Sequence, residues 1–220
     1  MSGDGITTFW ERLRGEALFR ARRRRAVAEL AAAFPDLTAA ERTALARRSA
    51  ALQARLAGEQ FATRDAVRLC RDLALDGADS LQQLRSMNLA NAAVFSAPFG
   101  APALAERAVG LYGDNAERRV CRLPTGGGAA RFAFLGRTER CATDWLPRST
   151  EWLFPVFATL EPQRRTRVVF EAPLPVAGDG EGATREALAA IERAVRARPE
   201  AWAWGARQGD SAEPQASAPG

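Results

Sequence analysis

The sequence predicts an α/β protein in which an N-terminal helical cap precedes a shortened mixed sheet flanked by helices. Up to about residue 75, glycine, proline and strand-forming residues are scarce, and apolar residues recur at intervals of three and four, which indicates helices. Beyond that point, short apolar runs alternate with helical stretches, which is typical of a sheet covered by helices. With 220 residues and 47% hydrophobic content, the chain is long enough to bury a sizeable core.

We therefore expect one domain over residues 1–208. Its helical cap spans 1–75 and its α/β core spans 76–208. The remaining residues, 209–220, are small and polar. We expect this tail to be disordered, because it cannot bury enough apolar surface to offset the entropy lost on folding.

Helix boundaries in the cap follow from local signals. Pro35 ends the first helix, because the residue before a proline is biased away from helical geometry. Thr38 and Glu41 have the spacing of a capping box, in which the hydroxyl and the carboxylate each satisfy a free backbone amide at a helix start. The expected helices are 8–34, 39–56 with its end at Gly58, and about 59–75.

The α/β core contains four strand candidates and two helix candidates. The strand candidates are short runs with β-branched or aromatic residues, bounded by turn or loop residues. The helix candidates are longer and keep a helical apolar period. The strands are 92–96, 131–135, 153–160 and 167–170, and the helices are 103–109 and 184–198.

Two absences limit the chemistry available to this chain. The sequence contains no histidine, and all 31 basic residues are arginine because there is no lysine. A Ser-His-Asp or Cys-His mechanism, a histidine-ligated metal, a Schiff-base lysine and a phosphate-loop lysine are therefore excluded within this chain. Carboxylates, thiols, hydroxyls, backbone amides and fixed arginine charges remain.

The cysteines favour a cytoplasmic protein with reduced thiols. Cys70, Cys121 and Cys141 have no metal-ligand spacing, and their odd number argues against a secreted disulfide framework. No stretch approaches the roughly 18 uncharged apolar residues of a membrane-spanning helix. Arg12 and Arg14 interrupt the region where a signal sequence would be apolar. We expect a cytoplasmic location, no integral membrane span, no metal and no cofactor.

The formal net charge of +5 raises the question of an anionic partner. Arginines concentrate at positions 20 and 22–25, without interleaved aromatic residues or a groove-reading motif, so we expect no nucleic-acid binding. Such a run is typical of a solvated helix face. The alternative interpretation is contact with a membrane surface, an acidic carrier protein or an anionic small molecule such as a phosphorylated metabolite.

Three sequence blocks occur in an order that carries a family resemblance. Residues 32–42 read AAFPDLTAAER, residues 151–170 contain FPVF and RVVF, and residues 190–204 end in WAW. In this order the blocks resemble the lead-in helices, the central strands and the closing helix with its tryptophan pair of the lysophospholipid acyltransferase superfamily, within it the lipid A late-acyltransferase branch. The resemblance implies an acyltransferase-like sheet.

The chain departs from that family where its chemistry is carried out. Family members use a histidine to remove a proton and, five residues later, a carboxylate to orient it. Pro98 stands at the position of the histidine, Ala103 at that of the carboxylate, and Ala206 at that of a later histidine. We find no counterpart of the family's N-terminal hydrophobic anchor, and only residues 104–133 fill a gap in which the family has a further strand–helix unit.

The same resemblance implies several site residues. Phe134-Leu135-Gly136-Arg137 is similar to a family motif whose arginine holds an anionic acceptor. Arg137 is therefore the candidate for phosphate or sulfate, which a planar guanidinium contacts with two hydrogen bonds. Ser96, Phe99 and Gly100 keep the outline of the family's active-site loop, and we expect them to line a substrate pocket.

Asp144 is the candidate general base, seven residues after Arg137. The alternative interpretations are that Arg137 is an ordinary exposed arginine and that Asp144 is an ordinary loop carboxylate. Ser96 has no histidine or lysine to activate it as a nucleophile.

Two functions remain open. The first is a repurposed acyltransferase-like protein without acyl-transfer activity, acting in a bacterial specialised-metabolite pathway. Among proteins of such pathways, the chain resembles the aziridine-forming proteins of azinomycin-type clusters. Ring formation by intramolecular displacement of sulfate or phosphate needs positioning, a carboxylate to take the amine proton and an arginine to stabilise the leaving anion. The alternative is a non-catalytic subunit that stabilises or activates a paralogous acyltransferase-like partner.

Both functions imply a second protein subunit. Loss of a strand–helix unit uncovers backbone groups and apolar surface at one sheet edge, which must be covered. We expect the partner to cover this edge, with Arg137 and Asp144 near the interface. Arg137→Ala should then impair function while the complex stays assembled.

The missing catalytic pair gives a first testable prediction. Because neither Pro98 nor Ala103 accepts a proton, the purified protein should transfer no acyl group from acyl-CoA or acyl carrier protein to a lysophospholipid or a lipid A precursor. The measurement is product formation beside a no-enzyme control and an active acyltransferase. Turnover above the no-enzyme control would contradict the prediction.

Overall fold

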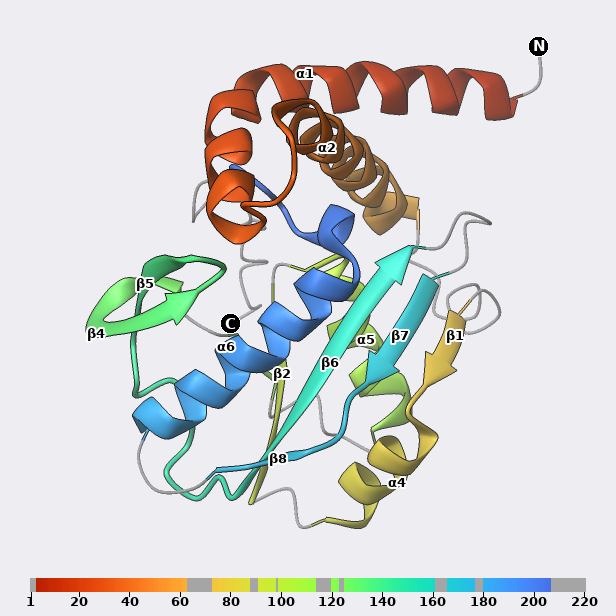
Figure 1. Cartoon of the computed structure of the whole chain (residues 1–220). Helices are drawn as coiled ribbons and strands as arrows, with labels where there is room; N and C mark the ends of the chain where they lie inside the picture. The colour runs from red at the N-terminus through yellow and green to blue at the C-terminus, as the bar shows by residue number, and fades with distance from the viewer. Residues whose placement is uncertain are drawn as a thin grey trace, which may run out of the picture.

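The computed structural model describes residues 3–62, 73–87, 91–97, 99–113, 120–122, 125–160, 166–176 and 180–206 (Figure 1). Two long helices come first, and a mixed sheet with helices on both faces follows, as the sequence predicts. Residues 88–90 and 98, and the C-terminal residues from 207, are among those outside the description. The expectation of a disordered tail at 209–220 therefore stays a prediction.

Helices α1 (Gly3–Ala33) and α2 (Ala39–Ala62) pack against each other over one end of the sheet (Figure 1). The predicted capping box starts α2: the backbone N of Thr38 donates to Glu41 Oε2 at 2.7 Å, and the backbone N of Glu41 donates to Thr38 Oγ1 at 3.3 Å. The hydrogen bond from the Thr38 backbone is the main cause of the lowered pKa of Glu41. Within the described part of the chain, no helix combines the length and hydropathy needed to cross a bilayer.

Two expected helix ends in this region are wrong. Helix α2 does not end at Gly58 but continues to Ala62. A glycine inside a helix costs only about 1 kcal/mol relative to alanine, which the packing of α2 outweighs. Residues 73–75, expected to end a third helix, instead belong to strand β1 (Leu73–Asp76), so the sheet begins before residue 76. A short apolar run does not distinguish a strand from a helix by its period.

The main sheet is mixed, in the order β1-β7-β6-β2-β3, and β8 also pairs with β6. Strands β2, β3 and β6 run parallel to one another, whereas β7 is antiparallel to β6 and parallel to β1. The strands expected at 92–96, 153–160 and 167–170 are confirmed. The remaining bounds are β2 (Ala92–Ser96), β3 (Val120–Arg122), β6 (Trp152–Leu160), β7 (Thr166–Phe170) and β8 (Leu174–Pro175).

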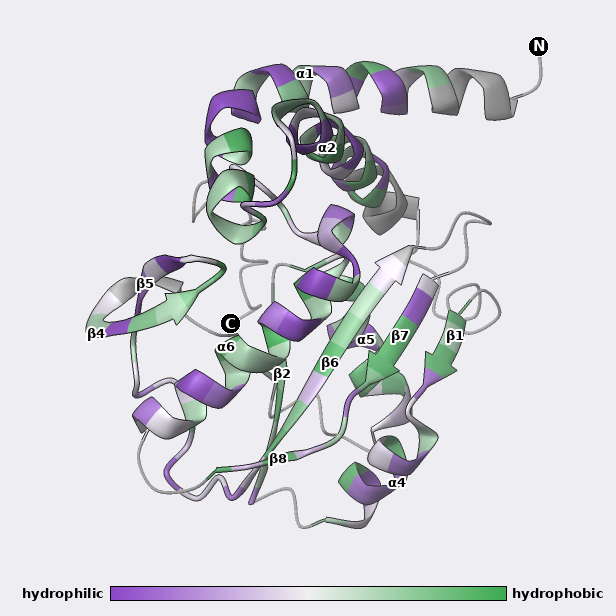
Figure 2. Ribbon diagram, viewed as in Figure 1, coloured by the Kyte–Doolittle hydropathy of each residue, from purple (hydrophilic) through white to green (hydrophobic). Residues whose placement is uncertain are grey.

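Side chains along β2 and β6 alternate between two core regions, as a pleated strand requires. Phe95 and Phe157 face the region covered by α6, while Val94 and Phe154 face the region covered by α5. Figure 2 shows the hydrophobic colour of these strands between the two helices. The helices are α5 (Pro102–Tyr112) and α6 (Gly180–Ala197), close to the predicted bounds, and the unpredicted α4 (Ala78–Ser86).

Strands β4 (Thr125–Phe134) and β5 (Arg137–Cys141) form a hairpin beside α6, which confirms the strand and turn expected at 131–136 (Figure 1). Leu135 and Gly136 in the turn both have positive φ, 48° and 72°, as tight hairpin turns require. A Cβ at Gly136 would come within 2.0 Å of the carbonyl oxygen of Ala32. The turn therefore lies directly against the end of α1.

The loop after β2 is held by backbone contacts on two sides. Gly100 donates its N–H to the carbonyl of Ala201 at 2.7 Å, and Ala101 donates to the carbonyl of Ala158 at 2.8 Å. Ala201 belongs to the short 3₁₀ helix η2 (Pro199–Ala201), which follows α6. Gly100 has φ 61°, and a Cβ there would lie 1.9 Å from the carbonyl oxygen of Ala158. Only glycine fits this position without displacing the loop.

Gly100→Ala is therefore expected to lower the free energy of unfolding by at least about 2 kcal/mol, because a left-handed backbone and a steric conflict coincide. The measurement is urea denaturation. The matched control is Gly110→Ala on an exposed position of α5, which should be neutral or slightly stabilising because alanine favours helix. Equal stability of the two variants would show that the loop is not held as described.

Candidate functional site

The carboxyl end of β2 carries Ser96, the first of the predicted site residues. Its side chain is buried and its hydroxyl donates to Glu106 Oε1 on α5 at 3.3 Å. The strand end meets the first turns of α5, which places the hydroxyl and the carboxylate side by side. The carboxylate orients the Ser96 hydroxyl, and no histidine exists in the chain to activate it.

Phe99 and Gly100 pack against other segments of the same chain. Phe99 is buried, forms a β-bridge with Trp202 and packs edge-on against Phe157, with ring centroids 5.5 Å apart. Gly100 forms a bridge with Ala158. These contacts occupy the place at the strand end where the sequence predicts a pocket lining. That expected role of Phe99 and Gly100 stays a prediction.

Of the two residues that the resemblance aligns with the family's catalytic pair, Pro98 lies outside the described residues. Ala103 lies in the first turn of α5 and is partly exposed. Its methyl group offers no proton acceptor.

Arg137 begins β5 and makes an ion pair with the buried carboxylate of Glu29 on α1. The distance from Arg137 Nη1 to Glu29 Oε1 is 3.0 Å, and Arg25 Nε lies 3.1 Å from the same oxygen. The second oxygen, Glu29 Oε2, accepts the backbone N–H of Gly205 at 2.8 Å. Arg137 Nε also lies 3.5 Å from Glu139 Oε2, which is within ion-pair distance although the two atoms form no hydrogen bond. The charge of Arg137 is thus already opposed by carboxylates of the chain.

Asp144 is exposed and lies beyond the other end of β5. The four residue steps from Arg137 to Cys141 alone span about 13 Å of extended strand. The loop around Asp144 lies at the start of α6, where Trp145 Nε1 donates to Thr184 Oγ1 at 2.9 Å. The structure therefore does not bring the two predicted residues, Arg137 and Asp144, together.

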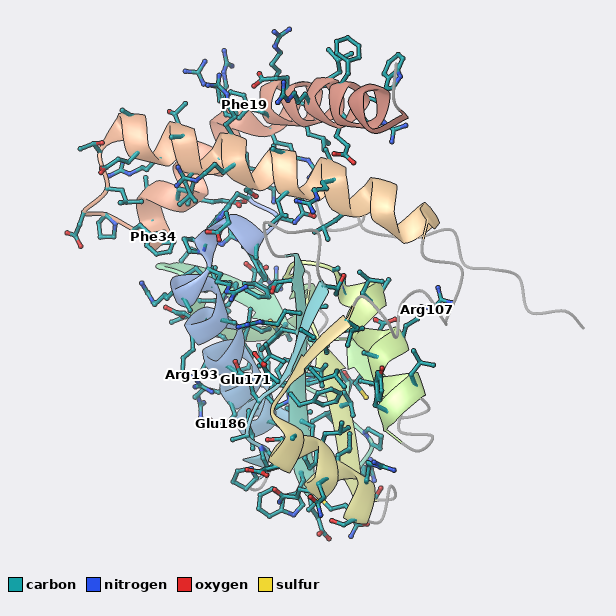
Figure 3. The ribbon with its side chains drawn as sticks, turned by 90° about the vertical axis from the view of Figure 1, so that its right-hand side faces the viewer. Phe19, Phe34, Arg107, Glu171, Glu186 and Arg193 are labelled. Atoms are coloured by element: carbon teal, nitrogen blue, oxygen red, sulfur yellow. The ribbon has the colours of Figure 1, made fainter. Side chains whose placement is uncertain are left out.

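A different carboxylate and guanidinium do lie together. Glu171 directly follows β7, and its Oε2 is 4.0 Å from Arg193 Nη2 on α6. Burial raises the pKa of Glu171, and Arg193 partly opposes that rise. Figure 3 shows Glu171, Arg193 and Glu186 along the same side of α6. The sequence did not predict this pair; an acidic residue at a strand end was the available signal, but it did not identify a partner.

The thiol of Cys141 on β5 is not a reactive group. Cys141 is buried, and burial, with a smaller contribution from Glu139, raises its pKa to about 11, so it is a neutral thiol at physiological pH. Cys121 lies on β3, and Cys70 is outside the described residues. No group of three acidic or cysteine side chains that would hold a metal ion occurs among the residues described.

Arg137→Ala should lower the free energy of unfolding by about 1 to 2 kcal/mol, because it leaves the buried Glu29 carboxylate with one cation fewer; the partial exposure of Arg137 reduces the cost below that of a fully buried pair. Arg140→Ala, at an exposed position of the same strand, is the matched control and should be near neutral. Thermal unfolding of both variants measures the difference. Arg137→Ala as stable as Arg140→Ala would rule out a structural role for the ion pair.

Comparisons with known proteins assign no family: no family model matches the chain, and no curated protein matches it. The resemblance to the lysophospholipid acyltransferase superfamily stays a prediction that depends on the three sequence blocks.

Proposed function

We propose that this chain is a non-catalytic subunit that stabilises or activates an acyltransferase-like partner protein. The observation that carries the proposal is the packing of the loop after β2. In the family that the sequence resembles, this loop holds the catalytic pair. Here Phe99 and Gly100 contact β6 and the segment after α6, and the family's catalytic positions hold Pro98 and Ala103.

The ion pair of Arg137 supports the same role. An arginine that binds a substrate anion must exchange its existing partner for the ligand. Arg137 contacts a buried carboxylate that would then lose a cation in a poorly solvated place, which is unfavourable. Arg137 thus acts in holding the hairpin to α1.

The partner's place is the sheet edge at β3. Among the described strands, β3 stands last in the sheet order on that side and pairs with β2. It lies in the stretch between Leu104 and Phe134 in which the family has a further strand–helix unit. An edge strand carries backbone donors and acceptors that a second chain can pair with.

A second candidate function is ring closure, and the pair of Glu171 and Arg193 favours it. In this step the substrate amine attacks carbon, a C–N bond forms, the C–O bond to sulfate or phosphate breaks, and the anion leaves with the bonding electrons. Glu171 takes the amine proton and Arg193 stabilises the leaving anion. Desolvation of Glu171, which raises its pKa, strengthens it as a proton acceptor.

Co-purification tests the subunit role and separates the two functions. A tagged chain expressed with its native operon should recover a second protein in defined stoichiometry, with a mass by light scattering above that of the chain alone.

Glu171→Gln should leave assembly and the activity of the complex unchanged, as should the control Glu186→Gln on the same side of α6. Loss of activity in Glu171→Gln alone, with assembly intact, would favour ring closure. If the chain were a monomer that is fully active without a partner, both the subunit role and the expected complex would be wrong.

A further inference from the structure

Helix α1 has a second apolar face that the fold does not cover. Its buried face carries Phe19, which packs toward α2 under the guanidinium of Arg47, 4.7 Å from the ring centroid (Figure 3). On the outward face, Phe9 and Trp10 are each 57% exposed and Leu13 is 47% exposed. Leu13 and Phe19 are six residues apart, about 240° around the helix, so the two faces are distinct. Exposed large apolar side chains in one cluster indicate a binding surface.

Arginines surround this outward face. Arg12 and Arg14 alternate with Leu13, and Arg20 and Arg24 continue the same side of the helix toward its C-terminal half. All four are exposed, and none of them forms an ion pair with a described residue. Two acidic side chains are described nearby: Glu11, which is partly exposed and lies between Trp10 and Arg12 in the sequence, and Glu16, which is 3.1 Å from Arg47. The face therefore combines aromatic rings with net positive charge.

We propose that this face of α1 binds the surface of an anionic lipid bilayer. A helix with Trp, Phe and Leu on one side and arginine beside them lies in the plane of a bilayer interface, with the rings at the headgroup level and the guanidinium groups at the lipid phosphates. Figures 1 and 3 both show the N-terminal half of α1 along the outer side of α2, away from the sheet, so a flat surface reaches this half without meeting the rest of the molecule.

The charge and shape of the face favour a bilayer over other occupants. A second copy of the chain would bring like arginine charges together. A partner protein would need an acidic apolar groove to receive a single convex helix. Binding of this kind is peripheral and weakens with salt, because the electrostatic part falls off within a Debye length. It is independent of the proposed subunit role.

The test is co-sedimentation of the full chain with vesicles of mixed phosphatidylcholine and phosphatidylglycerol, beside vesicles of phosphatidylcholine alone. We expect binding to the mixed vesicles only, reversed by high salt. The double variant Phe9→Ser with Trp10→Ser should partition at least about tenfold more weakly. Arg12→Gln with Arg14→Gln should weaken partitioning roughly fivefold per arginine. Leu111→Ser, at an apolar position 42% exposed on α5, and Arg140→Gln are the matched controls and should bind as the wild type does.

Tryptophan fluorescence gives an independent readout. Trp10 is the most exposed of the five tryptophans, so its emission should shift to the blue on binding, and Trp10→Phe should bind while losing that shift. Equal binding to both vesicle types, or no effect of the Phe9 and Trp10 substitutions on binding, would overturn the proposal. The proposal would also be overturned if the full chain did not bind vesicles and the Phe9 and Trp10 variant lost a co-purified protein. The face would then bind a protein partner.

Discussion

A buried carboxylate on the first helix connects three distant parts of this chain. Glu29 accepts the backbone N–H of Gly205 and lies within ion-pair distance of Arg25 and Arg137. A carboxylate removed from water is unfavourable unless charges and hydrogen bonds compensate it, so the native arrangement requires all three partners. Two of them come from elsewhere in the sequence: Arg137 brings the β4–β5 hairpin to α1, and Gly205 brings the segment after α6. The arrangement of the cap on the sheet depends on this contact.

The segment after α6 then determines what the end of the sheet can do. Once Gly205 is held by α1, Ala201 and Trp202 lie against the loop after β2, and α2 adds a hydrogen bond from Ser49 Oγ to the carbonyl of Trp202. Trp204 Nε1 donates to the carbonyl of Pro199 at 2.6 Å, which fixes the turn that follows α6. The loop that would carry catalytic groups at the carboxyl end of a parallel strand is thereby used for packing. This is the physical basis for proposing a subunit role rather than a catalytic one.

Local features of the sequence predicted most of the fold. The capping box, the proline after α1 and the short apolar runs of β2 and β6 each depend on neighbours within a few positions. Strand β1 and helix α4 were missed because four residues and nine residues are too short for their periods to be decisive. The site was harder for another reason. Arg137 was selected from a local motif, but its partner Glu29 and the pairing of Glu171 with Arg193 arise only from tertiary packing.

The central claim is that the loop after β2 is held closed by β6 and by the segment after α6. Native-state hydrogen exchange of the backbone amides of Gly100 and Ala101 tests it most directly, because those two amides make the contacts in question. The account predicts that both exchange only through global unfolding, as slowly as amides in the centre of β6, and that Glu29→Gln accelerates both. Exchange of Gly100 and Ala101 as fast as that of an exposed loop, under conditions in which β6 stays protected, would contradict the account.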